Sequence, residues 1–107
     1  MTSTFPPPLD RFVAAVNAGD TPVFLACFAP DALVDDWGRV FSGHAAIQGW
    51  SDRELIGAKG VLTVRGLSAT GGRVTLVGHW ASSVFTGESS FGFTLADGLI
   101  REMRITG

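Results

Sequence analysis

Two adjacent aspartates, Asp35 and Asp36, are the residues whose type and position most clearly suggest chemistry. They close a short apolar stretch beginning at Leu33 that is typical of a β-strand, and consecutive strand residues point to opposite faces. One carboxylate therefore points inward and the other to solvent. Burial among apolar walls disfavours the charged form, which suits such a carboxylate to accept and return a proton as a general base. Alternatively, both aspartates cap a turn at Gly38, because aspartate beside glycine is an ordinary turn residue.

Two histidines and one cysteine are the other reactive side chains. His44 lies in the first turn of a predicted helix, where we expect a solvated surface residue. His79 lies within a strand whose alternation places Trp80 inside and His79 outside, unless a β-bulge turns His79 toward the carboxylate. Cys27 is the only cysteine, and we expect it to be a small buried hydrophobe.

The number and spacing of the cysteine and histidine residues limit the metal sites, cofactors and cellular location that the sequence predicts. A single cysteine excludes an intrachain disulfide and a cysteine-clustered zinc site, and it favours a reducing, cytoplasmic location. The two histidines lack the helical spacing of metal ligands, and no phosphate-binding loop is present. The sequence therefore predicts a protein that uses no metal and no cofactor.

Large apolar side chains recur along the predicted elements and could line a substrate-binding pocket. They are equally what the core of a small domain requires, because large apolar side chains are buried by default. The candidates are Phe12, Phe28, Trp50, Trp80, Phe91, Phe93 and Met103.

Three helices are predicted in the N-terminal half. Apolar residues from Leu9 recur at helical spacing, and the helix is expected to stop at Gly19. A second helix opens at the Asp20 cap and runs through Phe28 to end near Pro30. A third begins after a Ser42 cap, with a possible restart at Ser51, and ends near Gly57 or Gly60.

Strand-like runs fill most of the remainder. A small hairpin around residues 33–41 precedes the third helix, and short turns between the later runs favour an antiparallel meander. Helices followed by antiparallel strands predict an α+β fold, with three N-terminal helices packed on a curved sheet. The later strand-like runs are Val61–Leu67, Arg73–Phe85, Phe91–Leu95 and Leu99–Thr106.

Length and charge limit the classes of protein that this chain can be. With 107 residues, 46% of them hydrophobic, the chain predicts one globular domain over residues 9–107 after a flexible lead-in over residues 1–8. The net charge is −2 and no two basic residues are adjacent, which disfavours nucleic acid and anionic membranes as partners. The longest apolar run, Val23–Ala29, is too short to span a bilayer.

Four segments carry a resemblance to a known family. They are Phe12–Asp20, Phe28–Asp36, Gly38–Trp50, which contains Gly-x-x-Ala-Ile-x-x-Trp, and Phe93–Ile100. In this order they resemble the SnoaL-like members of the nuclear transport factor 2-like superfamily. The resemblance implies a cone of three helices against a strongly curved, mixed and mainly antiparallel sheet, with a pocket inside. It also implies a homodimer formed through the outer face of the sheet.

The resemblance selects Asp36 as the pocket residue. In ketosteroid isomerases of this superfamily, the proton-shuttling aspartate ends a Val-x-Asp strand, and Asp36 is the matching position. The donors that stabilise the enolate there would fall near Phe12 and Phe91, and the chain has no tyrosine. Isomerisation of a ketosteroid by the usual arrangement is therefore disfavoured.

Two classes of function follow from these residues. The first is cofactor-free proton transfer on a small apolar ligand, of the isomerase, cyclase, dehydratase or hydrolase type, with Asp36 as general base. The second is a non-catalytic ligand-binding or dimerisation module whose cone is filled by its own side chains. A protein adaptor would require an exposed apolar patch, and the sequence gives no sign of one.

Overall fold

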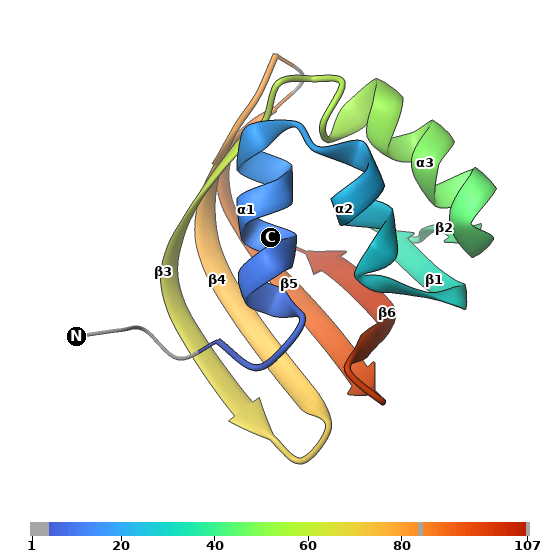
Figure 1. Ribbon diagram of the computed structural model, residues 1–107. Coiled ribbons are helices and arrows are strands. Elements are labelled where there is room, and N and C mark those ends of the chain that lie inside the picture. The colour runs from blue at the N-terminus through green and yellow to red at the C-terminus, as the bar shows by residue number, and fades with distance from the viewer. Residues whose placement is uncertain (1–4, 84, 107) are drawn as a thin grey trace.

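The computed structural model describes residues 5–83 and 85–106, which form three helices against one six-stranded sheet (Figure 1). The predicted lead-in lies partly outside these residues, at positions 1–4. No helix in the described ranges is long and apolar enough to cross a membrane. The elements are α1 (Leu9–Ala18), α2 (Thr21–Ala26), β1 (Phe28–Asp36), β2 (Arg39–Ser42), α3 (Gly43–Glu54), β3 (Val61–Thr70), β4 (Arg73–Ala81), β5 (Thr86–Ala96) and β6 (Leu99–Thr106).

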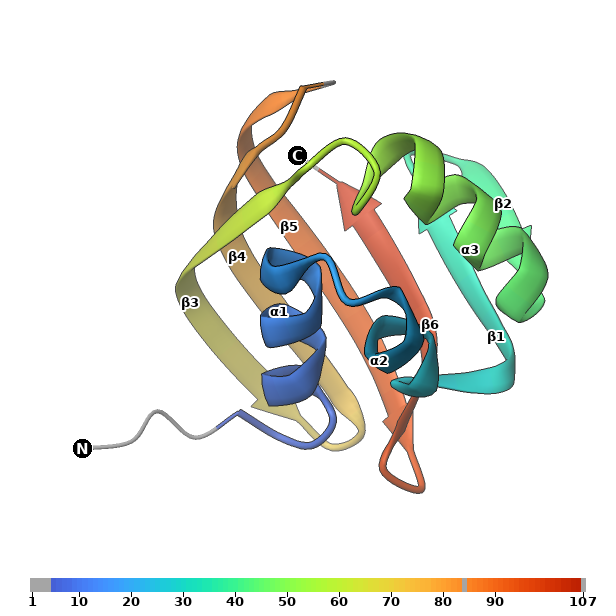
Figure 2. The ribbon, with the colours of Figure 1, turned by 45° about the horizontal axis from the view of Figure 1, so that its top comes forward.

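The sheet has the strand order β2-β1-β6-β5-β4-β3. Only the β1–β6 pair is parallel, and all the other pairs are antiparallel. The long strands β3, β4 and β5 curve strongly, and the three helices lie on the concave side of the sheet (Figure 2). The predicted α+β class, with helices on a curved and mainly antiparallel sheet, is confirmed.

The first helix begins and ends at the residues that the sequence marks, and the second helix begins where the sequence places its cap. In α1, Phe12 and Val16 are buried on one face, and Gly19 ends the helix in the left-handed conformation with φ 71°. The Asp20 side chain accepts a hydrogen bond from the backbone N–H of Val23 and so caps α2. Asn17 joins α1 to β3, because its amide donates to the Leu62 carbonyl and accepts from the Leu62 N–H.

Several predicted boundaries were wrong. Strand β1 begins at Phe28 rather than Leu33, β5 begins at Thr86 rather than Phe91, and α3 ends at Glu54 rather than near residue 57 or 60. The second helix ends at Ala26 rather than near Pro30, because Phe28 already pairs with Ile100 of β6, whose N–H donates to the Cys27 carbonyl. The run predicted as one strand to Phe85 ends at Ala81. A turn closed by Ser82, whose hydroxyl accepts from the Phe85 N–H, begins there. The third helix is continuous to Glu54, without a restart at Ser51.

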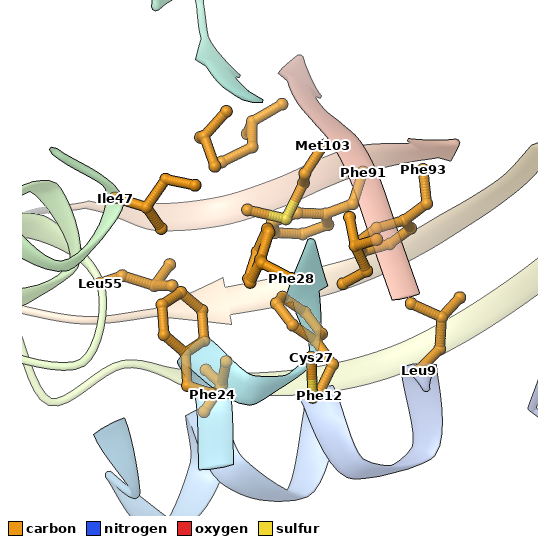
Figure 3. Close-up of a cluster of buried hydrophobic side chains, with 14 of the residues drawn as sticks. Leu9, Phe12, Phe24, Cys27, Phe28, Ile47, Leu55, Phe91, Phe93 and Met103 are labelled. Atoms are coloured by element: carbon orange, nitrogen blue, oxygen red, sulfur yellow. The ribbon is translucent and has the colours of Figure 1, made fainter. Parts of the chain in front are cut away.

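The core lies between α1, α2 and the concave face of the sheet (Figure 3). Phe12 of α1 has its ring centroid 5.3 Å from Phe93 of β5 and 6.1 Å from Phe28 of β1. Phe24 of α2 packs edge-on against Phe28 at 5.1 Å. These rings, with Met103, fill the closed end of the cone.

Candidate active site

A cavity of about 220 Å³ lies at the other end of the cone, where α3 meets the sheet. It is small beside the roughly 300–1,000 Å³ of common ligand pockets. All three tryptophans of the chain are on its wall. The residues that line this site cavity are Asp36, Trp37, Arg39, Trp50, Glu54, Leu55, Trp80, Phe85, Ser89, Phe91 and Ile105.

Asp36 lies on the cavity wall at the end of β1, on the same side of the strand as the buried Val34. Its side chain is only 13% exposed. The Oδ2 atom accepts two hydrogen bonds, one from Trp50 Nε1 at 3.0 Å and one from Arg39 Nη2 at 2.6 Å. The Oδ1 atom accepts none within the described part of the chain. The carboxylate is therefore held in one orientation with one oxygen unpartnered.

Arg39 links two carboxylates across the cavity. Besides Asp36, its guanidinium donates to both oxygens of Glu54 in α3, at 2.6 and 2.9 Å. This hydrogen-bonded pairing with Arg39 holds the pKa of Glu54 below its usual range and raises the pKa of Arg39. Asp36 is thus not the isolated carboxylate that the sequence suggested. Two carboxylates and one guanidinium give the cavity wall a net charge of −1.

The hairpin between β1 and β2 explains how Asp36 and Arg39 meet. Its two turn residues, Trp37 and Gly38, both have positive φ, at 54° and 91°, which is the turn type that pairs the flanking residues directly. Asp36 is accordingly the register partner of Arg39. The Asp35 carboxylate does not line the cavity and accepts a hydrogen bond from the Gly38 N–H. The turn-capping alternative thus describes Asp35 and not Asp36.

The seven predicted wall residues divide into two groups. Trp50, Trp80 and Phe91 line the site cavity, and Phe41 stacks on Trp50 with ring centroids 6.0 Å apart. The other four are fully buried and do not line the cavity, and Figure 3 shows them in the same core cluster as Phe91. They are Phe12, Phe28, Phe93 and Met103. Contact with a substrate stays a prediction for all seven residues.

The two histidines lie outside the cavity. His79 is on the outer face of β4, where its Nδ1 is 3.2 Å from Glu88, and the β4–β5 register runs without a bulge. His44 was expected to be solvated, but it is half-buried with its Nε2 2.9 Å from the Phe28 carbonyl oxygen. It therefore ties the first turn of α3 to β1.

The thiol and the potential metal ligands add no further site. Cys27 is buried as expected, its thiol donates to the Val23 carbonyl at 3.3 Å, and burial raises its pKa. Within residues 5–83 and 85–106, no group of three or more His, Cys, Asp or Glu side chains is placed to hold a metal ion.

Arg39, Glu54 and Ser89 are cavity residues that sequence reasoning missed. Arg39 could have been found from the two-residue turn, which sets it opposite Asp36. Glu54 lies four residues after Trp50 and so shares its helix face. Ser89 is buried on the cavity wall, and its hydroxyl makes no hydrogen bond within the described ranges. It was missed because β5 was predicted to begin after it.

Comparison with known proteins agrees with this fold. The family model for the SnoaL-like domain matches residues 9–103. No curated protein sequence matches the chain. Among solved structures, a candidate polyketide cyclase from Sinorhizobium meliloti is similar, with 24% identity, a TM-score of 0.84 and 92% of each chain covered.

Two further structures share the fold. The epoxide hydrolase/cyclase-like enzyme SalBIII, with a role in pyran ring formation in the polyether salinomycin, has 22% identity and a TM-score of 0.82, covering 91% of this chain and 84% of its own. A protein with a ketosteroid isomerase-like fold from Catenulispora acidiphila, solved in complex with trimethylamine, has 18% identity and a TM-score of 0.78, covering 97% of this chain and 87% of its own.

Proposed function

The chain belongs to the SnoaL-like domain family, and we propose that it binds a compact, mainly apolar molecule in the site cavity and transfers a proton on it with Asp36 as general base. The observation that carries this proposal is the Asp36 carboxylate on an aromatic cavity wall, with Oδ2 held by two donors and Oδ1 unpartnered. A fixed carboxylate with one free oxygen is arranged to take a proton from a molecule beside it.

The other polar groups of the cavity have roles in the same reaction. Arg39 and Trp50 orient the carboxylate, and orientation of the reacting groups is a main source of rate enhancement. The Ser89 hydroxyl, on the cavity wall in β5, would donate a hydrogen bond to an oxygen of the substrate. The reaction needs no cofactor, because a proton moves between substrate and carboxylate and returns.

The names of two similar structures favour oxygen-containing substrates. One is a candidate polyketide cyclase and another is epoxide hydrolase/cyclase-like. A cavity of about 220 Å³ limits the substrate to a compact molecule. We therefore propose compact epoxides and enolisable ketones as the first compounds to test.

The decisive experiment compares wild type with Asp36→Asn, which keeps the shape but removes the proton acceptor. With a panel of compact epoxides and ketones, we expect turnover to fall about 100-fold or more while binding changes little. Asp35→Asn is the matched control, since this carboxylate lies outside the cavity. Full activity of Asp36→Asn would contradict the proposal.

The second candidate is a ligand-binding module without catalysis. The Asp36–Arg39 ion pair favours it, because an ion pair can serve structure alone. In that case the panel binds, as seen by quenching of the tryptophan fluorescence, and no product forms with either protein.

We also propose an oligomeric state and a cellular location for the protein. We propose a homodimer through the outer face of the sheet, which carries the exposed Val77 and the His79–Glu88 pair. We propose a cytoplasmic location because the only thiol is unpaired and buried.

A further inference from the structure

Five of the eleven aromatic residues of the chain, including all three tryptophans, line the site cavity, and such a wall suits a positive charge. Trp37, Trp50 and Trp80 all line it, joined by Phe85 and Phe91. The face of an aromatic ring carries partial negative charge, most strongly in tryptophan, and it attracts cations. Building on the proposed function, we propose that the ligand of this cavity is a compact organic cation, a quaternary ammonium with apolar substituents.

The charged side chains on the cavity wall also favour a cationic ligand. Asp36 and Glu54 supply two negative charges and Arg39 one positive charge, so the wall is left with −1. A monocation neutralises this charge, a neutral ligand leaves it unbalanced, and an anion is repelled. The field of Asp36 is screened less than that of a surface charge, because this side chain is only 13% exposed and lies beside apolar rings.

Arg39 shows that the mouth of the cavity already holds a cation. Its guanidinium lies between the two carboxylates and 5.9 Å from the centre of the Phe41 ring. The side chain is 54% exposed, which places it toward solvent. Since Oδ2 of Asp36 and both oxygens of Glu54 are engaged with Arg39, the unpartnered Oδ1 of Asp36 is the negative atom left for a ligand.

A quaternary head is compatible with proton transfer by Asp36. It has no N–H to donate and is bound by ring faces and by the field of the carboxylates. Oδ1 therefore stays free to accept a proton from a carbon or hydroxyl elsewhere on the same molecule. Trp37 is the wall residue best placed to meet the charged head, because its side chain is 64% exposed at the hairpin turn.

The test compares choline with its uncharged carbon isostere, in which a tert-butyl group replaces the trimethylammonium head. Binding is measured by calorimetry and by the indole N–H resonances of the three tryptophans. We expect choline to bind about tenfold more tightly than the isostere and to shift all three resonances. Trp37→Leu should lose most of this preference, whereas Val40→Ala, an exposed residue on the same hairpin that does not line the cavity, should keep it.

Each contrary outcome has a distinct meaning. Equal or tighter binding of the uncharged isostere overturns the cation proposal and leaves the proposed proton transfer intact. Choline binding that is unchanged in Trp37→Leu and shifts no indole resonance places the cation elsewhere and also overturns it. If neither probe binds but the neutral epoxide and ketone panel does, the cation proposal alone falls. If no probe or panel compound binds, the proposed function falls with it.

Discussion

At the scale of single residues, Arg39 is the side chain on which the site cavity depends. Its guanidinium contacts both Asp36 and Glu54, and so it connects the β1–β2 hairpin to α3. Because the guanidinium is half exposed, water screens much of this pairing, and its contribution to stability is small. Its main contribution is geometric, since a planar guanidinium fixes the carboxylates that it binds.

Replacement of Arg39 by glutamine should change how the free energy of unfolding depends on pH, because Arg39 lowers the pKa of Glu54. The folded-state pKa of Glu54 is lowered by this arginine, so the pairing stabilises the fold above the unfolded pKa of Glu54. We expect Arg39→Gln to lose at most about 1 kcal/mol of unfolding free energy at neutral pH. The difference from wild type should vanish as the pH falls through the lowered folded pKa. Urea unfolding at a series of pH values measures it, and a pH-independent difference would contradict the pairing.

At the scale of elements, the turn of the β1–β2 hairpin contains a residue, Trp37, that has a strained backbone conformation and also lines the cavity. Trp37 adopts φ 54°, a conformation that bulky residues rarely take and that asparagine tolerates. Asparagine before glycine is also the preferred sequence for this turn. The tryptophan therefore strains the hairpin while its ring lines the cavity.

Trp37→Asn should accordingly separate stability from binding. We expect the free energy of unfolding to rise by up to about 1 kcal/mol, because the strain in the turn is relieved. Binding of cavity ligands should weaken, because one aromatic wall is lost. Thermal unfolding and calorimetric titration of the same samples test both parts. A lower free energy of unfolding in the variant would show that packing of the Trp37 ring stabilises the fold by more than its positive φ destabilises it.

The segment between α3 and β3 sets the position of Trp80. Gly60 is buried against the indole ring, and a methyl group at this position would clash with that ring. Gly60→Ala should lower the unfolding free energy by about 1–3 kcal/mol and displace Trp80 into the cavity. Gly66→Ala is the control, since the space around that strand glycine is open. Urea unfolding and the tryptophan emission spectrum report both effects, and equal behaviour of the two variants would contradict this packing.

At the scale of the whole molecule, the outer face of the sheet is the surface available for a second copy. Val77 is 38% exposed there, between the polar residues Thr75 and His79. An arginine in each copy of a symmetric interface would bring like charges together without partners. We expect Val77→Arg to convert the proposed dimer into a monomer at micromolar concentration. Light scattering after size exclusion measures this, and a monomeric wild type would remove the dimer proposal.

Local patterns predicted much of this molecule, and contacts between distant elements explain what they missed. The helices, the late strands and the outward direction of His79 follow from periodicity and turn residues close in sequence. The inward direction of Asp36 followed from strand alternation together with the family resemblance. The Arg39–Glu54 pair depends on how α3 packs against the hairpin, which no local pattern specifies. The end of α2 depends on pairing with Ile100, more than seventy positions along the chain.

The place of β6 in the sheet has a consequence for how the cavity comes into being. It lies between β1 and β5, and so it joins the half of the sheet that carries Asp36 to the half that carries Trp80 and Ser89. It is also synthesised after the other five strands of the sheet. During synthesis the two halves of the cavity therefore exist as separate surfaces, and the cavity forms only when this strand has been added. A nascent chain that ends before β6 has no site cavity in which the proposed ligand could bind.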